Sequence, residues 1–179
     1  VCDKSGTPPP GALSVARLSP ADGVDGADLL AAAAAVEQNS RHPVARAVVK
    51  VARQARLKLE DAHDFEEVAG KGVRATVQGE PVLVGRAGWI ADHLHDEHAR
   101  HAAHEAQRLA DDNGLSTLCV ARAGRLLGWV GLADNTRGEA SQSVDQTRGI
   151  GIKRLVMCTG DREAVAKRIA AELHTEYLA

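Results

Sequence analysis

The stretch HDFEEVAGKGVRATVQGEPVLVGR, residues 63–86, constrains the fold of this 179-residue chain more than any other. Its β-branched residues are interrupted by glycines, a pattern typical of short strands joined by tight turns. We expect strands over about 63–68, 72–78 and 81–85, with hairpin chemistry in the QGEP link between the last two. Because strands joined by such short links pair antiparallel, the middle of the chain is expected to form an antiparallel sheet.

Helical patterns and further strands surround this stretch. ALSVARL before it is typical of a short strand, and LSTLCVARAGRLLGWVGLAD after it of two strands joined at residues 123–124. Residues 25–39 form an Ala-rich helical stretch. A polar helical region over about 86–112 ends near residues 113–114, an Asn-Gly pair that signals a left-handed cap.

A second helix is expected directly after the Ala-rich one, running to about Ala55. Ser40 is expected to cap it, with Pro43 in its first turn, where a missing N–H costs least. Four apolar residues recur at helical spacing, which predicts one buried face: Val44, Ala47, Val48 and Val51.

From Thr136 the pattern changes to alternating helices and strands. We expect a helix over 137–148, a strand in KRLVMCTGD and a helix over 162–173, an alternation that indicates a parallel sheet. The simplest account is an α+β domain inserted into a doubly wound α/β domain, whose first strand ends at Asp3.

Composition excludes several classes of partner. The chain has 22 basic and 24 acidic residues and only four aromatic ones, so neither an electrostatic surface nor a stacking platform for nucleic acid is expected. The longest apolar run, LLAAAAAV, is far too short to span a bilayer, so this part of the protein is not expected to insert into a membrane. Three widely spaced cysteines favour neither a disulfide framework nor a thiolate zinc site.

Two short turns carry residue types suited to phosphate chemistry. TGD at 159–161 follows an apolar strand and precedes a helix, where backbone N–H groups bind phosphate, although alone it is more typical of a plain capped loop. DKSGT at 3–7 would be the matching turn after another strand of the same sheet. Its aspartate can attack a phosphoryl group to give an aspartyl-phosphate, and magnesium would offset the charge repulsion.

Two further motifs lie in the expected inserted domain. SRHPVARAV places His42 at the start of a helix, where it would face a ligand, or would be a surface histidine beside an N1 proline. VAGKGV contains Gly70 and Gly72, which allow close backbone approach, or form a tight strand-to-strand turn.

Together these motifs resemble those of the heavy-metal-transporting P-type ATPases, in the same order and at similar spacing. DKSGT matches the family's phosphorylation motif DKTGT, and SRHP matches its nucleotide-domain signature SEHP, with Glu37 five positions before His42. GKGV matches the GxG element, and VLVGR, which contains Gly85, matches the VGN-like segment. ADNTRGEA matches a D-x-x-R-x-E-A element, and TGD is intact. His-Pro followed by GxG separates the metal-transporting branch from other P-type pumps.

The resemblance implies a partial haloacid-dehalogenase-like Rossmann fold with an inserted α+β nucleotide-binding domain built on an antiparallel sheet. Residues 1–12 and 131–179 would form the phosphorylation domain, and residues 13–130 the nucleotide-binding domain. Asp3 would accept the γ-phosphate of ATP and bind Mg²⁺. The other residues expected around the phosphate are Lys4, Thr7, Asp134, Arg137, Thr159, Gly160 and Asp161. Those expected to hold the nucleotide are Glu37, His42, Gly70, Gly72 and Gly85.

The resemblance also implies a larger parent protein at the cytosolic face of the cell membrane, with transmembrane and actuator domains as partners in the same chain. General similarity favours zinc or cadmium over copper as the transported ion. The family's GDGxND motif, which supplies a magnesium-binding aspartate, does not occur in these residues, so the fragment alone is expected to bind ATP without turnover.

Departures from the family pattern keep other functions open. Ser5, Arg41 and Gly138 replace the usual Thr, Glu and Pro, and three prolines at 8–10 follow the phosphorylation motif directly. Because prolines remove N–H donors and fix φ, a catalytically inactive nucleotide-binding regulatory module, or a degenerate pump remnant, is the alternative. A soluble phosphatase of the same superfamily is a third hypothesis, for which the His-Pro and GxG pair would have no use.

One histidine cluster falls outside these motifs. DHLHDEHARHAAHE contains five of the eight histidines: His93, His95, His98, His101 and His104. Neighbouring imidazoles on one helix face could ligate a transition metal, but the pattern is more typical of a solvated polar face.

Overall fold

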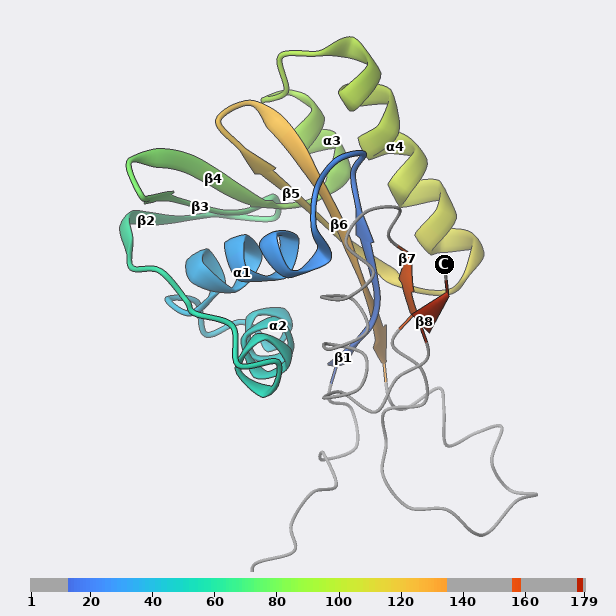
Figure 1. Ribbon diagram of the computed structural model, residues 1–179. Coiled ribbons are helices and arrows are strands. Elements are labelled where there is room, and N and C mark those ends of the chain that lie inside the picture. Colours follow the sequence, from blue (N-terminus) through green and yellow to red (C-terminus); the bar gives the residue numbers. More distant parts are fainter. Residues whose placement is uncertain (1–12, 135–155, 159–176, 179) are drawn as a thin grey trace, which may run out of the picture.

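The computed structural model describes residues 13–134, 156–158 and 177–178, which contain one mixed sheet of eight strands (Figure 1). The strand order is β2-β3-β4-β5-β6-β1-β7-β8. The strands are β1 (Leu13–Pro20), β2 (Ala62–Val68), β3 (Gly72–Val77), β4 (Glu80–Gly85), β5 (Ser116–Arg122), β6 (Arg125–Asp134), β7 (Val156–Cys158) and β8 (Tyr177–Leu178). The helices are α1 (Gly26–Glu37), α2 (Pro43–Gln54), α3 (Ala87–Ala91) and α4 (Glu97–Asp112).

The six strands from β2 to β1 in this order pair antiparallel, as the middle of the sequence predicts. Two-residue turns join β3 to β4 and β5 to β6, and both residues of each turn have positive φ: 53° and 80° at Gln78 and Gly79, and 48° and 75° at Ala123 and Gly124. Such turns match the twist of paired strands. The three strands expected in residues 63–86 and the junction at residues 123–124 are thereby confirmed.

The two faces of the sheet carry different helices (Figure 1). Side chains alternate between the faces. Val82 and Val84 pack in the cluster formed with α1 and α2, whereas Leu83 packs in the cluster formed with α3 and α4. The antiparallel part of the sheet is therefore covered on both sides.

The Ala-rich stretch forms α1 because small side chains let it lie close to the sheet. Leu29, Leu30 and Val36 are fully buried in it, together with several alanines. The helix begins with a capping bond, in which Asp25 Oδ1 accepts from the backbone N–H of Ala27 at 2.8 Å.

Two helix expectations require correction. The N-cap of α2 is His42 and not Ser40, because the residue before a proline is driven to extended backbone, and His42 has φ −62° and ψ 144°. The polar helical region divides into α3 and α4, because the chain leaves the helical conformation after Ala91 and Asp96 caps a new helix through the N–H of Ala99. Gly114 has the left-handed φ of 66° that the end of this region predicts.

Beyond the antiparallel strands, β7 pairs parallel with β1, and β8 parallel with β7. β7 lies within the strand expected in KRLVMCTGD, while the helices expected over 137–148 and 162–173 lie outside the described residues. β6 runs through residue 130, and the division into two domains there stays a prediction. In the described part of the chain, none of the helices has the length and apolarity needed to cross a bilayer.

Candidate functional site

The link between α1 and α2 is organised by Ser40 and His42. The hydroxyl of Ser40 accepts from the backbone N–H of His42 at 3.2 Å. Nδ1 of His42 accepts from the N–H of Val44 at 3.3 Å, which caps α2. The imidazole is therefore held by its own helix while the residue stays exposed at the surface.

The same serine joins this link to the sheet. Ser40 Oγ donates to Glu67 Oε1 at 2.8 Å, across 27 residues of sequence. Glu67 lies near the end of β2, directly before the turn that contains Gly70. The fold thus brings the SRHP motif beside the strand that leads into the GxG motif, and the connection runs through Ser40 and Glu67 rather than through His42 itself.

Glu37, the last residue of α1, is the one charged residue among the described buried residues, with 4% of its surface exposed. Burial, and secondarily the negative charge of Glu67, raise its pKa to about 7. Near neutral pH a large fraction of Glu37 is therefore protonated, and a protonated carboxyl both donates and accepts hydrogen bonds.

The three glycines of the predicted nucleotide site differ in their surroundings. Gly72 and Gly85 are direct partners in the β3–β4 ladder. A Cβ on either would collide with backbone of the neighbouring strand and with the ring of Trp89, at 2.9 and 2.8 Å respectively. Gly70 has a left-handed φ of 71° and open space within 4 Å of where its Cβ would be. Packing alone thus accounts for Gly72 and Gly85, whereas only Gly70 of the three borders open space.

A hollow of about 560 Å³ lies along α2 and reaches Glu37 and Ser40. Its described lining includes three cationic side chains of α2: Arg46, Lys50 and Arg53. His42 and the three glycines are not in this lining, so the described residues do not gather the whole predicted nucleotide set around one cavity. A second hollow of about 540 Å³ lies near the β3–β4 and β5–β6 turns, away from the SRHP motif.

The predicted phosphate-site residues are Asp3, Lys4, Thr7, Arg137, Thr159, Gly160 and Asp161, and all lie outside the described residues. Asp134 is the last residue of β6. The magnesium ligand expected at Asp3 is among those outside. Within residues 13–134, 156–158 and 177–178, no group of three or more His, Cys, Asp or Glu side chains is arranged to hold a metal ion.

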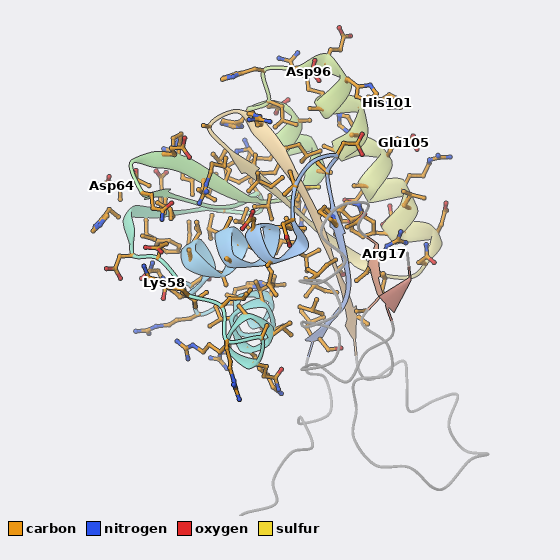
Figure 2. The ribbon with its side chains drawn as sticks, in the orientation of Figure 1. Arg17, Lys58, Asp64, Asp96, His101 and Glu105 are labelled. Atoms are coloured by element: carbon orange, nitrogen blue, oxygen red, sulfur yellow. The ribbon has the colours of Figure 1, made fainter. Side chains whose placement is uncertain are left out.

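The histidine cluster divides between α3, α4 and the link between them. His93 Nδ1 lies 2.8 Å from the carbonyl oxygen of Trp89, and the two rings meet edge to face with centroids 5.3 Å apart. His98, His101 and His104 are exposed. Figure 2 shows His101 on α4 at the outer surface, as expected for a solvated helix face.

Sequence reasoning missed Glu67. Its signal was its place at the end of a strand three residues before Gly70, on the face that packs against the helices. Alternation along β2 puts Glu67 on the same side as Phe65, which packs against the core under α1 and α2, and puts Glu66 on the other side. The pairing with Ser40 could not be predicted, because it depends on the tertiary position of the α1–α2 link.

The fold and motifs define a class of protein: the chain belongs to the haloacid dehalogenase-like hydrolase family, which matches residues 12–179. Within that class, its similarity is to heavy-metal-transporting P-type ATPases. It is 33% identical over 177 residues to the zinc/cadmium/lead-transporting P-type ATPase of Escherichia coli K12, an alignment that covers 99% of this chain and 23% of the relative. The chain thus spans about a quarter of the length of the curated relatives it matches.

Solved structures agree with this similarity. A zinc-transporting PIB-type ATPase, solved in a phosphoenzyme state, superposes with a TM-score of 0.58 at 29% identity, over 93% of this chain and 26% of the other. The N-domain of HMA8, a copper-transporting P-type ATPase, gives 0.57 at 26% identity, over 65% of this chain and 97% of that domain. The resemblance predicted from the motifs, and the fold class predicted with it, are confirmed.

Proposed function

We propose that this chain is the ATP-binding and phosphorylation region of a P-type ATPase that moves heavy-metal cations across a membrane through an aspartyl-phosphate intermediate. The observation that carries the proposal is the match of nearly the whole chain to a zinc/cadmium/lead-transporting ATPase, with DKSGT, SRHP, GKG and TGD in the order that the resemblance requires.

In this proposal the base of ATP binds beside the α1–α2 link, with His42 and Glu37 on one side and the Gly70 turn on the other. Support comes from the Ser40–Glu67 bond, which joins these two segments, and from Glu37, whose protonated carboxyl would donate to and accept from a base edge. Asp3 would then attack the γ-phosphate: its carboxylate oxygen forms the new bond to phosphorus, the β–γ bridging bond breaks, and ADP leaves.

The remaining parts of the proposal concern the parent protein. Lys4, Thr7, Thr159 and Asp161 would hold the phosphate, and Mg²⁺ would neutralise charge there. Phosphorylation would be passed to actuator and transmembrane domains of the same chain, with this region on the cytosolic side of the membrane. Relatives named for zinc, cadmium and lead, and others named for copper, match at similar identity, so zinc or cadmium is the proposed cargo on general similarity alone.

The test is phosphorylation of the full-length parent protein by ATP labelled at the γ-phosphate. The proposal predicts acid-stable label that is removed by hydroxylamine and is absent in Asp3→Asn. An unlabelled parent that still binds ATP would instead favour the regulatory module or pump remnant, for which the proline run at 8–10 is the specific observation. Release of label as free phosphate from a parent with no metal-stimulated turnover would favour the phosphatase.

A further inference from the structure

We propose that Glu67 is a positioning residue for the nucleotide site, which holds the His42 loop through Ser40 and releases it when Glu37 becomes charged. This inference rests on the proposed function for its effect on ATP. Its structural part, a tether between β2 and the α1–α2 link, stands on contacts within the described residues.

The tether is a chain of two hydrogen bonds. Glu67 Oε1 accepts from Ser40 Oγ at 2.8 Å, and Ser40 Oγ accepts from the His42 N–H at 3.2 Å. A hydroxyl can do both at once, because it has one proton to donate and lone pairs to accept. The bond to Ser40 therefore joins the Glu67 carboxylate to the backbone of the α1–α2 link.

Glu37 is the element that can break the tether. It is buried at the end of α1, and the charge of Glu67 acts on it strongly enough to raise its pKa further than burial alone. When Glu37 ionises, two carboxylates oppose each other beside a low-dielectric core. Glu67 is exposed and Glu37 is not, so the side chain that moves away is that of Glu67, and Ser40 loses its acceptor.

The other charged groups near Glu37 come from α2 and the link before it. Arg46, Lys50 and Arg53 line the same hollow as Glu37, and His42 lies at the α2 N-cap. These three cations are exposed and solvated, so they offset the ionisation of Glu37 only weakly. Within α1 the acidic residue is Asp28, in the first turn at the opposite end of the helix.

The chain offers a matched control in Glu66. It is the neighbour of Glu67 on β2 but lies on the other side of the sheet, where it pairs with Arg74 at 2.6 Å. Glu66→Gln removes the same charge from the same strand without touching the tether. Glu67→Gln keeps an oxygen that accepts from Ser40 and removes only the charge, whereas Ser40→Ala keeps the charge and removes the bonds.

The experiment has a ligand-free part and an ATP part, both on the whole 179-residue chain. In the ligand-free part, carboxyl carbon NMR follows the titration of Glu37, and hydrogen exchange follows the His42 amide. We expect the Glu37 midpoint near pH 7, a lower midpoint in Glu67→Gln, and no change in Glu66→Gln. We expect faster exchange of the His42 amide in Ser40→Ala, and in the unsubstituted chain as Glu37 ionises.

In the ATP part, affinity is measured at pH 6 and pH 8. If only the protonated form holds the loop, affinity falls about tenfold over this range, since the competent fraction falls from about nine-tenths to about one-tenth. Glu37→Gln should remove this dependence, and Ser40→Ala should weaken binding several-fold at pH 6, with Glu66→Gln unchanged in both respects.

The outcomes separate the inference from the function on which it rests. Absence of ATP binding at either pH would overturn the proposed function, while the Glu37 titration and the His42 exchange would still decide whether the tether exists. ATP binding that is independent of pH and indifferent to Ser40→Ala would overturn the inference and leave the proposed function standing. A Glu37 midpoint that is the same in Glu67→Gln and in the unsubstituted chain would also overturn it.

Discussion

Replacing glycines of the β3–β4 ladder by alanine should destabilise the fold in an order set by the surroundings of each glycine. At Gly85 the new methyl would meet the Lys71 carbonyl, the Gly72 Cα at 2.9 Å and the Trp89 ring at 2.8 Å. Two of these neighbours are backbone in a hydrogen-bonded ladder and cannot rotate away. Overpacking of this kind costs about 1–3 kcal/mol, and we expect about 2–3 kcal/mol for Gly85→Ala.

Gly72→Ala should cost more and Gly70→Ala less. Gly72 adds a backbone conformation that alanine resists, φ 157°, to a similar collision, so about 3–5 kcal/mol is expected. Gly70 has a left-handed φ of 71° with open space around it, which leaves only the backbone term of about 1–2 kcal/mol.

Urea unfolding followed by far-ultraviolet circular dichroism measures these free energies, with ATP affinity measured on the folded fraction. We expect Gly85→Ala to retain ATP affinity wherever it is folded, because its methyl meets Trp89 and the ladder rather than open space. A Gly85→Ala chain as stable as the unsubstituted one, but unable to bind ATP, would refute the reasoning and make Gly85 a ligand contact.

Three further predictions concern the core and its edges. Because burial and Glu67 raise the pKa of Glu37 to about 7 from an ordinary 4.5, its ionisation opposes folding as pH rises through this window, and Glu37→Gln should gain about 2–3 kcal/mol relative to the unsubstituted chain between pH 5 and pH 8 in urea unfolding. A gain that is the same at both pH values would contradict this. Asp25→Ala should lose about 1 kcal/mol through the missing α1 cap, whereas Asp22→Ala, in the same loop, should stay within about 0.5 kcal/mol; equal losses would show that the cap contributes nothing. Cys119 is fully buried with its pKa raised to about 12, so alkylation at pH 8, with the other two cysteines replaced by serine, should be about a thousandfold slower than in urea, and comparable rates would contradict the burial.

The antiparallel core was predictable because its signals are local. Gly79 and Gly124 mark two-residue turns, and the apolar alternation in residues 72–85 sets which side chains face each helix layer. Local rules also misled, because Ser40 is a strong capping residue in isolation. The proline at position 43 moved the cap to His42 and left Ser40 to bond with β2.

The candidate site was predictable in its parts and not in its connections. Glu37 and His42 were found from motif spacing, but burial of Glu37 and its coupling to Glu67 depend on where β2 meets the end of α1. Gly72 and Gly85 were assigned to ligand binding, while Trp89, on α3, supplies a packing reason for both. Whether they also contact ATP stays a prediction, as do the roles of the residues at 3–7 and 159–161.

The most direct test of the nucleotide-site proposal is an ATP titration of the whole ¹⁵N-labelled chain at pH 6, followed by amide shifts. The account predicts saturable shifts at His42, Gly70 and neighbouring amides of the α1–α2 link, with His42→Ala weakening binding and leaving the spectrum of the sheet unchanged. Saturable shifts confined to the hollow near the β3–β4 and β5–β6 turns, with none at His42 or Gly70, would contradict it.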